Sequence, residues 1–261
     1  MLINQVDNAF PFSSFIPFYT NGLGIKNNAT TPNTQLDIAA GTCLDSTGTF
    51  QLSSNASITI NAANNGLNGL DQGTFAQATV YAVFLVADPV SLQTTGAMIS
   101  TNLVTPLLPF GYSAYALIGY AVTIGNAAHF LPAYWTDNDS NNRVCTFDAP
   151  QSIPLAASGA ATSYAAGATS LVHLVPAVNN LQVSLAYSFI PGNAAGDTLK
   201  FQGGASTGDQ VTITGQVTTV HVTGNCTVLS QLVTGVPTIN YEVTNAGDTA
   251  AASVAGFTFH L

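Results

Sequence analysis

Charge is what this 261-residue chain most lacks. Charged residues make up 6% of it, against about 25% in an ordinary globular protein. The basic residues are Lys26, Arg143 and Lys200, and the formal net charge is −9. Because a nucleic-acid interface neutralises phosphates with Lys and Arg, this composition excludes nucleic acid as a partner. It equally disfavours electrostatic docking on an anionic membrane.

Long hydrophobic runs are also missing. No apolar stretch reaches the roughly 18–20 residues of a spanning helix, so we expect no membrane insertion. The N-terminal residues carry no basic region and two prolines, which makes a poor secretory signal. The three cysteines, Cys43, Cys145 and Cys226, lie far apart without a Cys-x-x-Cys pair. We expect three buried thiols, and neither a zinc site nor a redox pair.

The polar residues that are present suit strands and turns. Hydrophobic residues make up 47% of the chain, and the polarity comes from Asn, Thr, Ser, Gln and Gly. Exposed helices draw on Glu, Lys and Arg, yet Glu242 is the single glutamate. The composition therefore predicts an all-β protein.

Alternation of apolar and polar residues predicts short strands before residue 135. We expect them at residues 34–40, 50–52, 56–61 and 98–101. Residues 78–87 are almost entirely apolar, which indicates a central strand covered on both faces. Clusters of Asn-Gly make residues 62–73 a loop. Residues 115–124 and 129–134 predict a hairpin that turns at residues 125–128.

The character of the chain changes after the polar run of residues 135–149, which predicts a domain boundary near Pro150. Strands are expected at residues 169–175, 181–190, 198–203, 209–213, 217–222, 226–232, 238–244 and 252–260. Eight short strands at this spacing are typical of an antiparallel β-sandwich of jelly-roll type. The predicted organisation is an aromatic and proline-rich arm (residues 1–20), a β-rich domain (21–149) and a C-terminal β-sandwich domain (150–261). The arm either packs along its own domain or contacts a neighbouring subunit.

Four segments resemble a recurrent domain of tailed-bacteriophage virion proteins, usually of the tail-fibre or appendage type. They are Gly-Leu with Asn-Asn in residues 22–28, Leu-Asp-Ile-Ala-Ala-Gly within residues 32–46, Gly-Leu-Asp-x-Gly before the strand in residues 66–87, and Gly-Tyr, Ile-Gly and Phe-Leu-Pro within residues 111–132. They follow the family's order over about residues 20–135. One departure stands at residues 113–117, which are uncharged where relatives carry Lys and Arg. The second half resembles the family's C-terminal module less specifically.

This resemblance implies a structural virion component, made in the bacterial cytoplasm, that attaches to the particle through its aromatic N-terminus. It implies a homotrimer as the self-assembly, other virion proteins as partners, and a host-surface glycan or receptor as a further contact. A capsid-decoration or head-fibre protein is an alternative position on the particle. An extracellular glycan-binding, lectin-like or adhesin-like β-sandwich is the alternative from another class, and an enzyme comes third.

No catalytic, cofactor-binding or metal residue is assigned from the sequence, and no cofactor is expected. Asp137, Asp139 and Asn141 have the spacing of a Ca²⁺ loop, but Asn142 replaces the usual glycine and Arg143 adds a positive charge. A solvated interdomain loop is therefore the preferred interpretation. The four histidines share no metal-ligand spacing, and most Asp residues stand beside turn formers. A glycosidase needs a close carboxylate pair, for which the sequence offers no signal.

Overall fold

The computed structural model describes residues 20–88, 95–139, 142–153, 155, 163, 168–178, 181–192, 194–203 and 210–260. Every regular element in these ranges is a strand, which confirms the all-β class. Among them there is no helix that could cross a membrane. The predicted arm, up to residue 19, lies outside the described residues.

The strands are β1 (Thr20–Gly22), β2 (Ile25–Asn27), β3 (Gln35–Ile38), β4 (Gly41–Leu44), β5 (Gln51–Ser54), β6 (Ile58–Asn61), β7 (Val80–Ala87), β8 (Gly96–Ser100), β9 (Ala114–Val122), β10 (Ala133–Asp139), β11 (Asn142–Ile153), β12 (Ala168–Ser170), β13 (Leu181–Ile190), β14 (Thr198–Gly203), β15 (Gln210–Thr214), β16 (Val222–Val233), β17 (Val236–Val243) and β18 (Thr249–His260).

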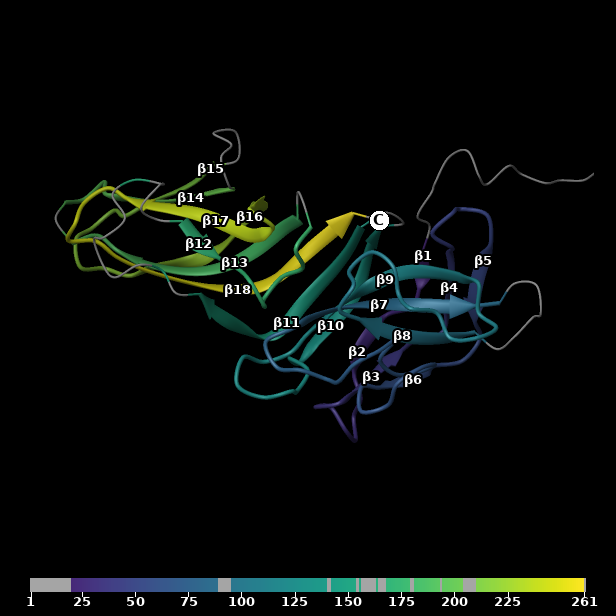
Figure 1. Cartoon of the computed structure of the whole chain (residues 1–261). Coiled ribbons are helices and arrows are strands. Elements are labelled where there is room, and N and C mark those ends of the chain that lie inside the picture. The colour runs from purple at the N-terminus through teal and green to yellow at the C-terminus, as the bar shows by residue number, and fades with distance from the viewer. Residues whose placement is uncertain are drawn as a thin grey trace, which may run out of the picture.

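One antiparallel sheet runs through the whole molecule. Its strands follow the order β16-β13-β18-β11-β10-β2-β3-β6, so it joins both halves of the chain. We call it the shared sheet; in Figure 1 it forms the lower layer, with β14, β15 and β17 over one end and β7, β8 and β9 over the other. The predicted boundary at Pro150 falls inside β11, within the irregularity between Thr146 and Gln151. The division into domains stays a prediction.

At the N-terminal end of the shared sheet, three chain segments (β1–β2, β3–β4 and β5–β6) each pass from one sheet to another. Strands β2, β3 and β6 pair within it, and the adjoining β1, β4 and β5 pair in a separate small sheet. Leu23, at the corner between β1 and β2, adopts a positive φ of 56°. The Leu23 N–H donates to the Ala40 carbonyl (3.3 Å) and the Ala39 N–H donates to the Gly24 carbonyl (2.8 Å), which fastens the corner.

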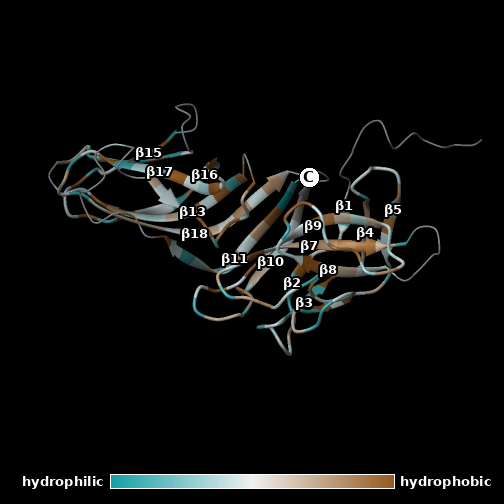
Figure 2. Cartoon of the chain, in the orientation of Figure 1, coloured by the Kyte–Doolittle hydropathy of each residue, from teal (hydrophilic) through white to brown (hydrophobic). Residues whose placement is uncertain are grey.

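The sheet β8-β7-β9 covers this N-terminal half. The central strand, β7, is buried on both faces over Tyr81–Ala87, and Figure 2 colours it hydrophobic along its length. This confirms the prediction drawn from its uninterrupted apolar run. Such a strand needs a layer on each side, and the bent segments and the shared sheet supply them.

The C-terminal half is a jelly roll. Strands β11, β13, β16 and β18 form one layer in the order β16-β13-β18-β11, and the facing layer has the order β15-β14-β17 with β12 paired to β17. The ends of β16 and β17 pair in a hairpin that joins the two layers. These eight strands in two sheets, linked by repeated crossings between them, are the jelly-roll arrangement. The sandwich prediction is thus confirmed. One expected strand, residues 217–222, is instead a turn in which the Thr219 N–H donates to the Pro191 carbonyl (2.9 Å), and β16 begins at Val222.

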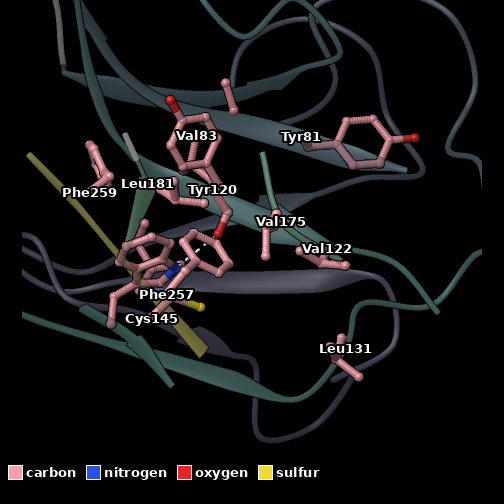
Figure 3. Close-up of a cluster of buried hydrophobic side chains, with 14 of the residues drawn as sticks. Tyr81, Val83, Tyr120, Val122, Leu131, Cys145, Val175, Leu181, Phe257 and Phe259 are labelled. Atoms are coloured by element: carbon pink, nitrogen blue, oxygen red, sulfur yellow. Dashed lines mark hydrogen bonds between the residues drawn. The ribbon is translucent and has the colours of Figure 1, made fainter. Parts of the chain in front are cut away.

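The inner face of the shared sheet carries one continuous core. Trp135, Cys145, Phe257, Val183 and Val228 are successive cross-strand partners and are all buried. Figure 3 shows Tyr120, Cys145 and Phe257 gathered where the two halves meet. The Phe257 ring lies 5.4 Å from the Trp135 ring and 6.0 Å from the Phe147 ring, nearly perpendicular to the first. Edge-to-face contacts of this kind are favourable for aromatic pairs.

Two predictions for residues 115–149 differ from the structure. Residues 125–128 do turn, and a short hairpin forms around them through the bridge between Thr123 and Phe130, with the Ile124 N–H donating to the His129 carbonyl (2.9 Å) and the Leu131 N–H donating to the Val122 carbonyl (2.7 Å). The hairpin is shorter than predicted, because the main partner of β9 is β7. The polar run is not a solvated loop, because β10 and β11 form a hairpin within it. Trp135, Arg143 and Phe147 are buried there.

Candidate interaction surface

The outer face of the shared sheet spans eight strands. One row of cross-strand partners crosses all its strands: Thr227, Ser184, Gly256, Thr146, Tyr134, Lys26, Asp37 and Thr59. Cross-strand partners point to the same face, so this row lies opposite the core. The face therefore extends without interruption over both halves of the chain.

Apart from Asp148 at its β11 edge, the C-terminal part of this outer face carries no Asp, Glu, Lys or Arg side chain. Its residues are mostly small: Thr223, Asn225, Thr227 and Leu229 on β16, Gln182, Ser184, Ala186 and Ser188 on β13, Ala251, Ser253, Gly256 and Thr258 on β18, and Val144, Thr146 and Ser152 on β11. Short side chains leave the sheet flat and allow another surface to approach closely. We call this region the neutral face.

The N-terminal part of the outer face is chemically different. Tyr134 is exposed and pairs with Lys26, which pairs in turn with Asp37. The Asn28 amide donates to both Asp37 oxygens at 2.9 and 3.0 Å, and the Thr59 hydroxyl donates to one of them at 2.7 Å. Here an aromatic side chain stands beside a fixed group of hydrogen-bonding side chains.

The candidate Ca²⁺ motif at Asp137, Asp139 and Asn141 overlaps a β-hairpin. Asp137 and Asp139 lie on β10, where their cross-strand partners are Arg143 and Asn142, and Asn141 lies outside the described residues. A twelve-residue Ca²⁺ loop needs an irregular chain that curls around the ion. Strands on both sides of residues 140–141 replace such a chain.

Arg143 is fully buried and binds backbone carbonyls. Its Nη2 donates to the Leu23 carbonyl at 2.9 Å and its Nη1 donates to the Ile118 carbonyl. Leu23 forms the corner after β1, and Ile118 lies at the register shift between β9 and β7. Strand pairing is interrupted at both places, so their carbonyls need another donor. Sequence reasoning missed this role, because the two acceptors lie 25 and 120 residues away.

Two buried carboxylates meet in the C-terminal half. Asp248 accepts from the Gly192 N–H (2.9 Å) and the Asn245 N–H (3.0 Å), and Asp197 accepts from the Ala194 N–H (3.0 Å) and the Asn245 amide. Asp197 is 4% exposed and Asp248 is not exposed at all. Since turn N–H groups occupy their oxygens, these residues fasten turns, and a glycosidase pair open to substrate is not formed.

The remaining titratable groups of the described residues are dispersed. Within the described residues there is no cluster of three or more His, Cys, Asp or Glu that could hold a metal ion. The Ser188 hydroxyl lies 3.3 Å from His221 Nδ1 in an exposed position, and no hydrogen bond between His221 and a carboxylate accompanies it in this part of the chain. A nucleophilic pair needs a third group that orients its base.

The cysteines are free thiols. Burial raises the pKa of Cys43 to about 12, although the nearby Arg143 charge acts to lower it. Burial also raises the pKa of Cys145, and it raises that of Cys226 to about 11. Cys43 and Cys145 are buried as expected, whereas Cys226 is half-buried. A protonated thiol is a poor nucleophile, so these residues serve packing.

A small cavity lies beneath the shared sheet, between Leu36, Tyr120, Val122, Leu131 and Trp135. It holds about 10 Å³, which is room for about one water molecule, and its walls are mainly apolar. It is therefore too small for an organic ligand.

Comparison with known proteins identifies no relative. No protein-family model and no curated protein matches the chain. A solved structure, titled "Structure of infectious bursal disease virus Gx strain", is 14% identical over 93% of this chain and 69% of that chain, with a TM-score of 0.19.

Proposed function

We propose that this protein is a structural component of a bacteriophage virion, of the tail-fibre or appendage type. It acts by assembling with copies of itself, as a trimer, and with other virion proteins. The neutral face is the observation that carries the proposal. The resemblance of residues 20–135 to phage virion proteins supports it, and so does the jelly roll, an architecture that viral capsid domains use.

Electrostatics favour self-assembly through the neutral face. The chain has a net charge of −9, so two copies repel each other wherever carboxylates face one another. The neutral face has no carboxylate on β13, β16 and β18, and Asp148 lies at its β11 edge. Its Ser, Thr and Asn side chains are weakly solvated compared with ions. Burying it against another copy therefore avoids the cost of desolvating charges.

The role proposed is non-catalytic and needs no cofactor. In a virion the other contacts are neighbouring proteins of the particle and the host surface. A capsid-decoration protein would assemble in the same way at a different position on the particle.

Light scattering coupled to size exclusion tests this proposal with a matched pair of variants. The wild type should have about three times the 26.8 kDa mass of one chain. Thr227→Glu puts a carboxylate on the neutral face and should lower the mass toward that of a monomer. Thr212→Glu puts one on β15, an exposed strand of the facing sheet, and should leave the mass unchanged. A monomeric wild type, or equal effects of the two substitutions, would contradict the proposal.

A glycan-binding module is a second candidate, favoured by Tyr134. An exposed aromatic ring can stack on a sugar, and the adjoining Lys26 and the Asn28–Asp37–Thr59 group can hydrogen-bond to its hydroxyls. Jelly rolls also serve as lectins. Binding on a sugar array that Tyr134→Ala abolishes and Thr212→Ala leaves intact would support this candidate. The absence of any bound sugar would count against it.

A further inference from the structure

The loop of residues 101–113, between β8 and β9, presents three large apolar side chains to solvent. Val104 is 74% exposed, Leu107 is 58% exposed and Phe110 is completely exposed. We call these three residues the apolar strip. Other apolar residues of the loop, among them Leu103 and Leu108, pack against the core instead.

Hydrogen bonds hold this loop in one shape. The Leu107 N–H donates to Asp71 at 3.0 Å, and the Asn102 side chain accepts from the Val104 and Thr105 N–H groups at 3.0 and 3.1 Å. The exposure of the strip is therefore a property of a fixed surface. A fixed surface with neighbouring exposed apolar residues marks a contact site.

The strip leads to the edge of the molecule from which the N-terminal arm departs. Just after Phe110, the Ser113 N–H donates to the Ala87 carbonyl (3.2 Å), and the Tyr115 carbonyl accepts from the Ser46 N–H (2.7 Å). Ser46 belongs to the turn between β4 and β5, and β4 is the partner of β1, in which Thr20 pairs with Cys43. Phe50, on the same turn, is also exposed (42%). The chain before Thr20 thus starts beside these residues.

The sequence of the arm matches this surface. Residues 1–19 contain one Asp (Asp7) and no Glu, Lys, Arg or His, and their C-terminal part carries Phe10, Phe12, Phe15 and Phe18. Ten extended residues span about 33–36 Å, which is ample for reaching along a thirteen-residue loop. Aromatic side chains of a tethered segment meet a nearby apolar surface at a high effective concentration.

We propose that residues 10–19 of the same chain lie along the apolar strip. This inference resolves the choice that the sequence leaves open, between a contact with the arm's own domain and a contact with a neighbouring subunit. It is independent of self-assembly through the neutral face, so the two proposals can fail separately.

Photo-crosslinking in the full chain tests the contact directly. Benzoylphenylalanine replaces Phe110, and as a control it replaces Val217, an exposed apolar residue of the C-terminal half. The expected product is a crosslink from position 110 to residues 10–19 at the mass of one chain. Covalent dimers joined through the arm would overturn the inference in favour of a neighbouring copy. A crosslink to no part of the arm would also overturn it, and the position-217 probe should not capture the arm.

Amide hydrogen exchange supplies a second measurement without a bulky probe. In the full chain, Phe15→Ser should speed exchange over residues 103–112 by at least about tenfold, since losing one buried aromatic contact weakens the cover. Exchange in β13 should not change. Equal exchange in the wild type and the variant would overturn the inference. The mass by light scattering, measured alongside, reports on the assembly proposal alone.

Discussion

The two ends of strand β18 show how one sheet serves two parts of the same core. At its C-terminal end Phe257 and Phe259 meet Tyr120 and Trp135 in ring contacts, whereas Ala252 and Val254 fill the core of the jelly roll. Both ends alternate inward and outward in the same way. The size of the inward side chains differs, because the layers that cover the sheet differ.

The buried ions follow the same division. In the N-terminal half Arg143 donates to carbonyls that a corner and a register shift leave without strand partners. In the C-terminal half Asp197 and Asp248 accept from the N–H groups of turns. Turns need acceptors in both halves, since Asp45 accepts from the Thr49 and Phe50 N–H groups in the N-terminal half, whereas the bent half also needs a donor for its unpaired carbonyls. The comparison indicates that the N-terminal half depends more on single, irreplaceable side chains.

Replacing Phe257 by alanine tests this contrast with the largest effect. Phe257→Ala removes a fully buried ring that touches other aromatic rings, and it should lower the free energy of unfolding by about 3–5 kcal/mol. Val254→Ala, on the same strand, should cost roughly 2 kcal/mol, since it removes two buried methyl groups. Urea unfolding at pH 7 measures both. Equal costs would contradict the difference between the two ends.

Arg143→Met sharpens the comparison at the buried ions. The substitution keeps the apolar part of the side chain and removes the donors to the Leu23 and Ile118 carbonyls. Each buried carbonyl left without a donor should lower the free energy of unfolding by about 1–3 kcal/mol. The matched control is Lys200→Met, at a partly exposed cation in the jelly roll. Thermal unfolding should show a much lower Tm for the first variant. A neutral Arg143→Met would show that these carbonyls find other donors.

Asp45 should make the stability of the N-terminal half sensitive to acid. Burial acts to raise the pKa of Asp45, but hydrogen bonds from the Phe50 N–H, the Thr47 hydroxyl and the Thr49 N–H lower it below the ordinary value. The folded form thus favours the ionised carboxylate. At pH values above the ordinary pKa of about 3.9 this preference stabilises the folded protein, and the stabilisation is lost as the pH falls through the lowered pKa. The difference in unfolding free energy between wild type and Asp45→Asn should shrink when urea titrations move from pH 7 to below pH 4. A difference that stays constant with pH would contradict this role.

The smallest effect is expected for the ion pair between Lys200 and Glu242. These side chains are cross-strand partners on β14 and β17, 3.0 Å apart and about one quarter exposed. Such a pair contributes about 0.2–1 kcal/mol, and salt screens it. The free energy of unfolding should change less between low and high salt for Glu242→Gln than for the wild type. A large salt-independent loss would indicate that Glu242 has a packing role.

Local patterns in the sequence predict much of the fold. The alternation that predicts strands at residues 181–190 and 198–203 agrees with β13 and β14. The apolar run of residues 78–87 predicts a doubly covered strand, as β7 is. Such features depend on neighbouring residues, since alternation decides which side chains can share one face. The all-β class and the C-terminal sandwich follow from the same local rules.

Long-range contacts decided the rest. The polar run around Arg143 predicts a solvated loop, because a charged side chain is buried only when distant groups satisfy it, and Leu23 and Ile118 carry no local sign of that need. The meeting of Asp197 with Asp248 through Asn245 is hidden in the same way, as is the joining of both halves in one sheet. The sequence by itself determined the strands and their faces. Only the tertiary structure decided which polar groups are buried, because hydrogen-bond partners are chosen by proximity in space.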